Sequence, residues 1–322
     1  MPNEISKSVR YQLKIKGLPS REGTISVRSL MTVLSKLVDC AERGLRLAVE
    51  GESLKRGRLP EWLDRAVDFT VTGMATGSTV LNLEAPILGQ TIPEQLIQPD
   101  LWFLTPSQED TAVSLVTRSV RDTTNENLES EYYDTGVLNS LQSFRTFIKT
   151  EAEQIELCSE DRPQEGFLLN IQQLAKVDRL KERIPEPRVF LVSGHLNSIE
   201  HNRRRFQLVV KEGQIIPGRV DEEYLPVEAM REFWGKKVTV KGLVHFKASG
   251  GVQVIEAQMI KPMEAGELLF QELPSIQTEM DFARAASRGA TERKDWLKEI
   301  WGKWPGEESI EKLMEELEHR KS

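Results

Sequence analysis

The sequence predicts an α+β protein that consists of an N-terminal strand-helix-hairpin-helices domain, a small β-barrel and a helical C-terminal tail. Three observations support this fold class. Apolar and polar residues alternate along 9–16, apolar residues recur at helical spacing between 26 and 50, and five short alternating runs follow one another closely after residue 185. The predicted domain limits are 8–184, 185–262 and 263–322.

The first domain is predicted from its strand and helix signals. Residues 9–16 alternate as a half-buried strand does. Residues 26–50 form a helix with Ser26 as its N-cap and Gly51 just past its end. The further elements expected are a hairpin of strands 67–72 and 79–84, and helices over 109–123, 135–153 and 166–184.

The second region carries the clearest fold signal. Its strand runs are 188–199, 205–210, 214–220, 237–246 and 252–260, with a short helix at 226–234. Three strands, a helix and two strands in this order resemble the OB-fold, a small Greek-key barrel. Gly194 and Gly242 lie in the middle of strands, which is typical of sharp bends in a small barrel.

Composition excludes several classes of protein. The chain has 322 residues, of which 39% are hydrophobic and 29% charged, so general disorder is excluded. No run of eighteen apolar residues occurs and the first residues lack an apolar core, so we expect neither a membrane span nor a secretory signal. The two cysteines are far apart, and Cys40 is expected to be a small buried hydrophobe. Together these features lead us to expect a cytoplasmic protein. The net charge of -7 favours solubility and argues against a protein that coats nucleic acid or membrane along its whole length.

Motifs of catalysis and of metal or cofactor binding are missing from the sequence. None of the four histidines has a histidine partner three or four residues away, and neither C-x-x-C nor H-E-x-x-H occurs. There is no G-x-S-x-G, no Walker-type loop and no G-x-G-x-x-G. We therefore expect a binding protein rather than an enzyme, with no metal and no cofactor.

The tail is unusually rich in tryptophan. Three of the six tryptophans lie between residues 296 and 304, beside the helix-breaking run 302–306 and a final amphipathic helix at 309–318. This pattern fits a clasp that folds back on the first domain, or an arm that lies in a partner's groove. The predicted partner-binding residues are Trp296, Ile300, Trp301, Lys303, Trp304, Ile310, Leu313 and Leu317.

Residues 301–313, WGKWPGEESIEKL, resemble the tail of bacterial antitoxins of PIN-domain ribonuclease toxins, which reads G-x-W-P-G-D-E-S-x-E-E-L. The resemblance covers about fifteen to twenty-five residues, and Glu307 stands where Asp is usual. The upstream chain is larger than such antitoxins and does not resemble their DNA-binding module. The resemblance implies an antitoxin-like protein whose tail neutralises a PIN-domain ribonuclease. A cation, Lys303 or alternatively Arg293 or Lys298, would face the carboxylates that hold the nuclease metal.

The alternative hypothesis is that the barrel binds single-stranded nucleic acid. Residues 186–262 contain twelve Lys or Arg against nine Asp or Glu, and OB barrels bind oligonucleotides with a strand face and two loops. The residues predicted for this role are Arg203, Arg204, Arg205, Phe206 and Lys247. A third hypothesis is a scaffold without an inhibitory role.

Overall fold

The computed structural model describes residues 7–18, 24–54, 59–75, 79–98, 105–200, 204–220 and 223–274. These residues form two hydrophobic cores. One is built from residues between 9 and 180 together with Ala248, and the other from residues between 192 and 260. Residues 275–322, with all the predicted partner-binding residues of the tail, lie outside the described residues.

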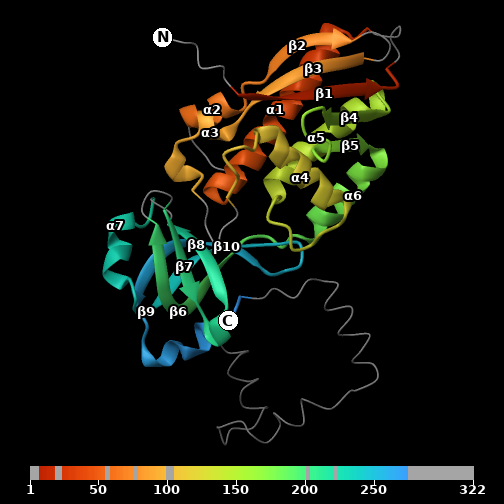
Figure 1. The fold of residues 1–322 in the computed structure, drawn as a ribbon. Coiled ribbons are helices and arrows are strands. Elements are labelled where there is room, and N and C mark those ends of the chain that lie inside the picture. Colours follow the sequence, from red (N-terminus) through yellow and green to blue (C-terminus); the bar gives the residue numbers. More distant parts are fainter. Residues whose placement is uncertain are drawn as a thin grey trace, which may run out of the picture. The chain divides into compact units, whose positions relative to one another are not determined.

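The first core lies between an antiparallel sheet and a layer of helices. The sheet has the order β2-β3-β1-β4-β5, and α1, α4, α5 and α6 pack against one of its faces (Figure 1). The strands are β1 (Ser8–Lys16), β2 (Thr70–Ala75), β3 (Thr79–Pro86), β4 (Gln154–Ser159) and β5 (Gly166–Asn170). The helices are α1 (Val27–Glu50), α2 (Glu61–Ala66), α3 (Leu88–Thr91), η1 (Glu94–Leu96), α4 (Ala112–Thr124), α5 (Thr135–Thr150) and α6 (Ile171–Arg183).

The local signals of β1 and α1 act as predicted. Alternate residues of β1 are buried against the helices, while those between them lie on the other face of the sheet. The Ser26 side chain accepts a hydrogen bond from the backbone N–H of Ser29, which caps α1. Gly51 adopts a left-handed conformation with φ 81°, and its N–H donates to the carbonyl of Leu47. Both predicted helix boundaries are confirmed.

The predicted helix over 166–184 is wrong at its beginning. Residues 166–170 form β5, which pairs with β4 as a hairpin, and α6 starts only at Ile171. Phe167 and Leu169 are both buried with the period of two that a strand gives, and the side chain of Asn170 caps α6. A short apolar run directly before a helix cannot be assigned to strand or helix from its period alone. For this reason the hairpin was not predicted from the sequence.

The second core fills a closed five-stranded barrel with the strand order β10-β8-β7-β6-β9. β8 and β10 pair in parallel, and the other neighbours are antiparallel. This order, with a short helix between the third and fourth strands, fits an OB-fold. The strands are β6 (Arg188–Glu200), β7 (Arg205–Val209), β8 (Ile215–Val220), β9 (Lys237–Phe246) and β10 (Val252–Pro262). The helical segments are η2 (Lys211–Gly213), α7 (Val227–Met230), η3 (Arg231–Phe233) and η4 (Ala265–Gln271).

Two barrel glycines allow strands to approach closely. A Cβ on Gly194 would lie 2.6 Å from the carbonyl oxygen of Val209, and one on Gly242 would lie 2.3 Å from that of Glu256. Both contacts are with the backbone of a neighbouring strand, which a side chain cannot push aside cheaply. Glycine is therefore required at both mid-strand positions, in keeping with the sequence pattern.

Two further expectations concerned the burial of Cys40 and the absence of a membrane span. Cys40 is 1% exposed, and burial raises the pKa of its thiol to about 12, as for the small buried hydrophobe that was predicted. Cys158 is not in a disulfide. In the part of the chain that the structure describes, no helix combines the length and the apolar character needed to cross a bilayer.

Candidate functional site

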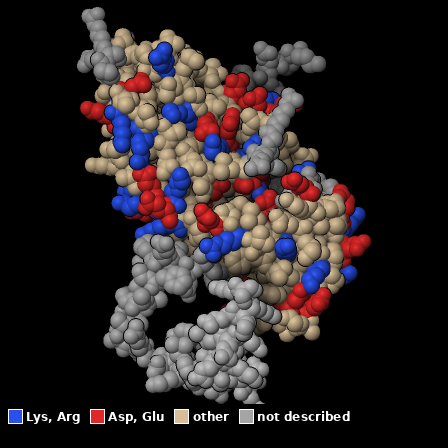
Figure 2. Space-filling model, turned by 180° about the vertical axis from the view of Figure 1, so that it is seen from behind, with Lys and Arg blue, Asp and Glu red and all other residues tan. Residues whose placement is uncertain are grey.

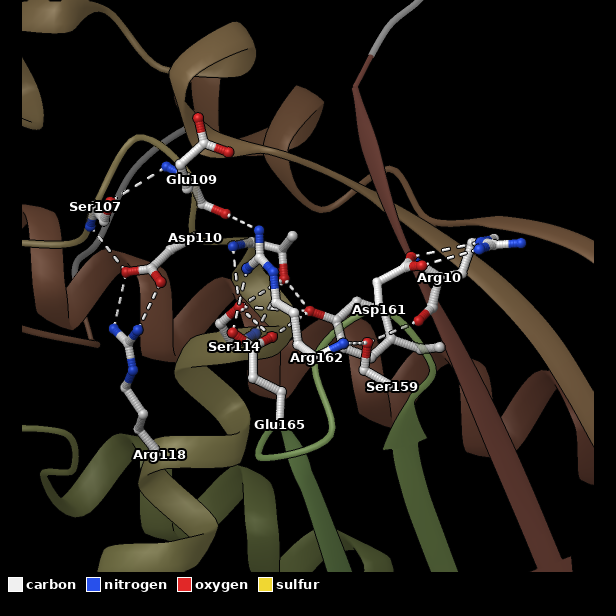
Figure 3. Close-up of polar contacts among 12 residues, drawn as sticks. Arg10, Ser107, Glu109, Asp110, Ser114, Arg118, Ser159, Asp161, Arg162 and Glu165 are labelled. Atoms are coloured by element: carbon white, nitrogen blue, oxygen red, sulfur yellow. Dashed lines mark hydrogen bonds and ion pairs between the residues drawn. The ribbon is translucent and has the colours of Figure 1, made fainter.

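A polar cluster joins the start of α4 to the sheet in the first domain (Figure 3). The hydroxyl of Tyr11 donates to Oε2 of Glu165 at 2.7 Å, and the hydroxyl of Ser114 donates to the same oxygen at 2.8 Å. Thr111, the N-cap of α4, lies 2.8 Å from the Tyr11 hydroxyl. Burial raises the pKa of Tyr11, so its hydroxyl remains protonated and acts as a donor.

Charged groups at the edge of this cluster are paired with one another. Arg162 donates to Oε1 of Glu165 at 3.2 Å and to the carbonyl of Glu109 at 2.6 Å. Arg118 donates from Nη1 to Oδ2 of Asp110 at 2.8 Å. Each of these charged groups thus faces an opposite charge or a carbonyl. The arrangement fastens the first turn of α4 to the β4–β5 turn, which is a structural role.

The second cluster lies on the outer side of β7 and β8. Phe206 and Leu208 point into the barrel and are 0% exposed, so their neighbours on β7 point outward. Yet the outward residues Arg205 and Gln207 are only 3% and 2% exposed. Outward side chains of a barrel reach solvent unless something covers them. For Arg205 the cover is the first domain.

The last turn of α1 covers Arg205. The guanidinium donates to the carbonyl of Ala48 at 3.4 Å and also to that of Val49. These carbonyls belong to the end of α1, where backbone acceptors have no partner within the helix and carry the negative end of the helix dipole. A buried arginine at this position satisfies the acceptors and places its charge favourably.

Arg219 lies directly opposite Arg205 in the β7–β8 pairing. Its side chain is 9% exposed and forms ion pairs with Glu52, just beyond α1, and with Glu256 of β10 at 2.9 Å. His245, whose Nε2 lies 3.5 Å from Oε2 of Glu256, and then Arg219 lower the pKa of Glu256 to about 2. Burial instead raises the pKa of Glu52, against the opposing pull of Arg219.

The β9–β10 turn makes a separate contact with the loop between α4 and α5. Lys247 Nζ donates to the carbonyl of Glu129 at 3.3 Å and lies 3.6 Å from a carboxylate oxygen of Glu131. The N–H of Ser249 donates to the carbonyl of Leu128 at 3.2 Å. A small cleft remains between these contacts, lined by Leu47, Glu50, Arg205, Arg219, Lys247 and Gln253 among others.

The structure brings together only part of the residues predicted to bind nucleic acid. Arg205 and Lys247 line the same cleft, whereas Arg204 is exposed in a left-handed turn with φ 54°. Phe206 belongs to the barrel core, and Arg203 lies outside the described residues. Sequence reasoning missed Arg219. Its signal is the alternation along β8, which places Arg219 on the outer side beside Arg205.

Surface charge on the face of Figure 2 is mixed, with Lys or Arg close to Asp or Glu over its described part. Among the described residues, no group of three or more His, Cys, Asp or Glu is arranged to hold a metal ion. Comparison with known proteins gives no relative, because no protein-family model, no curated protein and no solved structure matches the chain.

Proposed function

We propose that this chain is a non-enzymatic cytoplasmic binding protein that neutralises a PIN-domain ribonuclease through its C-terminal segment. The observation that carries the proposal is the run 301–313, with tryptophans on both sides of Lys303 and the Trp-Pro-Gly sequence of the antitoxin tails that it resembles. Tryptophan is enriched at the centres of protein interfaces, where one buried residue can contribute about 2–4 kcal/mol.

The geometry of the barrel favours the tail over the barrel as the partner-binding element. OB barrels take ligands on the outer face of their second and third strands and on two loops. In this chain that face is β7–β8, and Arg205 and Arg219 on it already contact the first domain. The β9–β10 turn, one of the two loops, is also docked through Ser249. In the structure, therefore, the face and the turn with which OB barrels bind ligands are already in contact with the first domain.

The chemistry of the target explains why a cation would stand between aromatic residues. PIN nucleases bind divalent metal with a cluster of carboxylates, and a lysine placed among them replaces the metal charge and excludes RNA. In the proposed complex Trp301 and Trp304 supply apolar contact and Lys303 supplies the inhibitory charge. Ile310, Leu313 and Leu317 form the apolar stripe of a helix that lies in a groove of the nuclease.

The test requires the nuclease itself. We expect a PIN-domain reading frame beside the gene for this chain, and we expect the full chain to stop RNA cleavage by its purified product. A chain that ends at Gly289 should lose both binding and inhibition. Binding of the truncated chain at full strength, or the absence of inhibition by the full chain, would overturn the proposal.

A further inference from the structure

Three cations gather where the barrel meets the first domain. Arg205 and Arg219 are cross-strand neighbours on β7 and β8, and Lys247 lines the same cleft from the β9–β10 turn. The Lys247 side chain is 17% exposed and that of Arg219 is 9% exposed. Like charges directly opposite one another in a sheet repel, so this arrangement needs anionic partners.

The first domain supplies acceptors of the kind that a phosphate backbone offers. Arg205 donates to two carbonyl oxygens at the negative end of α1. Arg219 pairs with the carboxylate of Glu52 in addition to that of Glu256 on the barrel itself, and Lys247 lies near the carboxylates of Glu129 and Glu131. Arginine and lysine bind phosphate oxygens with the same donors.

The fit of the first domain on this face is incomplete. Within the described residues, Nε of Arg219 and Oε1 of Gln207 are buried and have no hydrogen-bond partner. Both residues are more than nine-tenths buried, with exposures of 8% for Arg219 and 2% for Gln207. A buried polar atom without a partner costs stability. A ligand with more acceptors, or the entry of water, would satisfy the donor of Arg219.

We propose that the outer face of β7–β8 and the β9–β10 turn form a binding site for the phosphate backbone of single-stranded nucleic acid, and that the end of α1 with the loop at 128–131 covers this site as an internal anionic mimic. The barrel exposes the site only when these contacts open. The inference goes beyond the proposed function and does not depend on the C-terminal segment.

The composition of the face determines the mode of binding. A single strand fits because the face and the turn are the elements with which OB barrels bind oligonucleotides. The only aromatic residue of β7 and β8, both fully described, is Phe206, whose side chain lies in the core. In the proposed complex, therefore, no base stacks on an aromatic residue of β7 or β8, and these strands contact the phosphate backbone through electrostatic interactions. With three cations, the logarithm of affinity should fall with the logarithm of salt at a slope of about -2.

The test opens the contact without adding positive charge. In the full chain, Glu52→Gln, Glu129→Gln and Glu131→Gln are combined, and affinity for fluorescent oligo(dT) is measured at several salt concentrations. The matched control combines Glu94→Gln, Glu182→Gln and Glu186→Gln, which removes the same charge at exposed positions. The opened variant should bind oligo(dT) about tenfold more tightly than the control, because a larger fraction of it is competent to bind. Equal affinities would overturn the proposal.

Two further measurements locate the site and separate it from the tail. Adding Lys247→Gln to the opened variant should abolish most of the gain, and oligo(dT) should slow hydrogen exchange in residues 205–209 and 215–220. A gain that persists without Lys247, or protection elsewhere only, contradicts the proposed site. Ending the opened variant at Gly289 should leave oligo(dT) binding unchanged, so loss of the site and loss of nuclease inhibition are distinguishable. Circular dichroism confirms that each variant is folded.

Discussion

Arg205 on β7 and Arg219 on β8 are direct cross-strand partners, and both are almost completely buried. Two buried guanidinium groups side by side are unfavourable unless each has an acceptor. The first domain supplies acceptors to both, from the end of α1 and from Glu52. The stability of the barrel is therefore coupled to its contact with the first domain.

The first prediction concerns the ion pair of Glu52 with Arg219. Glu52→Ala should lower the free energy of unfolding by about 1–3 kcal/mol, because it removes the whole side chain and with it the hydrogen bond and the contact that Glu52 gives to the buried Arg219. The loss is limited because Glu256 remains 2.9 Å from Arg219. Urea unfolding measures it. Glu94→Ala, at an exposed position, is the control and should change stability little. Equal effects of the two changes would contradict the coupling.

The second prediction concerns acid. His245 and Arg219 hold the pKa of Glu256 at about 2, below the value of about 4.3 for an unfolded chain. A lowered pKa in the folded state contributes stability that is fully present above the unfolded pKa and is lost as the pH falls toward 2. Stability should therefore decline between about pH 5 and pH 2. Glu256→Gln should flatten this part of the profile of urea midpoint against pH, and an unchanged slope would contradict the assignment.

The third prediction concerns strand packing in the barrel. Gly242→Ala should destabilise the protein by about 1–3 kcal/mol, because its Cβ would meet the carbonyl oxygen of Glu256. The control is Gly266→Ala in η4, where an added Cβ meets nothing within 4 Å. Thermal unfolding of the two variants should differ clearly. A tolerated Gly242→Ala would mean that β9 and β10 separate easily at this point.

The fourth prediction concerns the proposed nuclease complex. Lys303→Ala should weaken inhibition of RNA cleavage more than it weakens binding, because the charge acts on the carboxylate cluster. Trp304→Ala should weaken both by about tenfold or more, since it removes an apolar anchor. Titration calorimetry and a cleavage assay give the two readouts. Lys236→Ala and Trp234→Ala, at exposed barrel positions, are matched controls and should leave both readouts unchanged.

Local signals predicted the parts of the fold whose pattern is long or sharply bounded. The period and caps of α1 and the glycine-marked strands of the barrel are of this kind. The β4–β5 hairpin was missed because its runs are short, and a buried strand beside a helix N-cap reads as more helix. Whether these runs are strand or helix is decided by the pairing of β4 with β1, which lies far away in the sequence.

The residues of the covered face show a second limit of sequence reasoning. The alternation along β7 separates Arg205 from Phe206, and it could have shown that one of them must lie in the core. No local pattern, however, reveals that Arg205 meets the carbonyls of Ala48 and Val49, because these residues are more than 150 positions apart in the chain. Of the arginine run that the sequence suggested as a binding surface, Arg205 is covered in the folded chain, whereas Arg204 is exposed.

Ala248, in the β9–β10 turn, is 4% exposed and belongs to the core otherwise built from residues between 9 and 180. The packing of the first domain is therefore complete only after the β9–β10 hairpin has been synthesised. A nascent chain that has emerged only as far as α6 still lacks the contact of Ala248 with the first core.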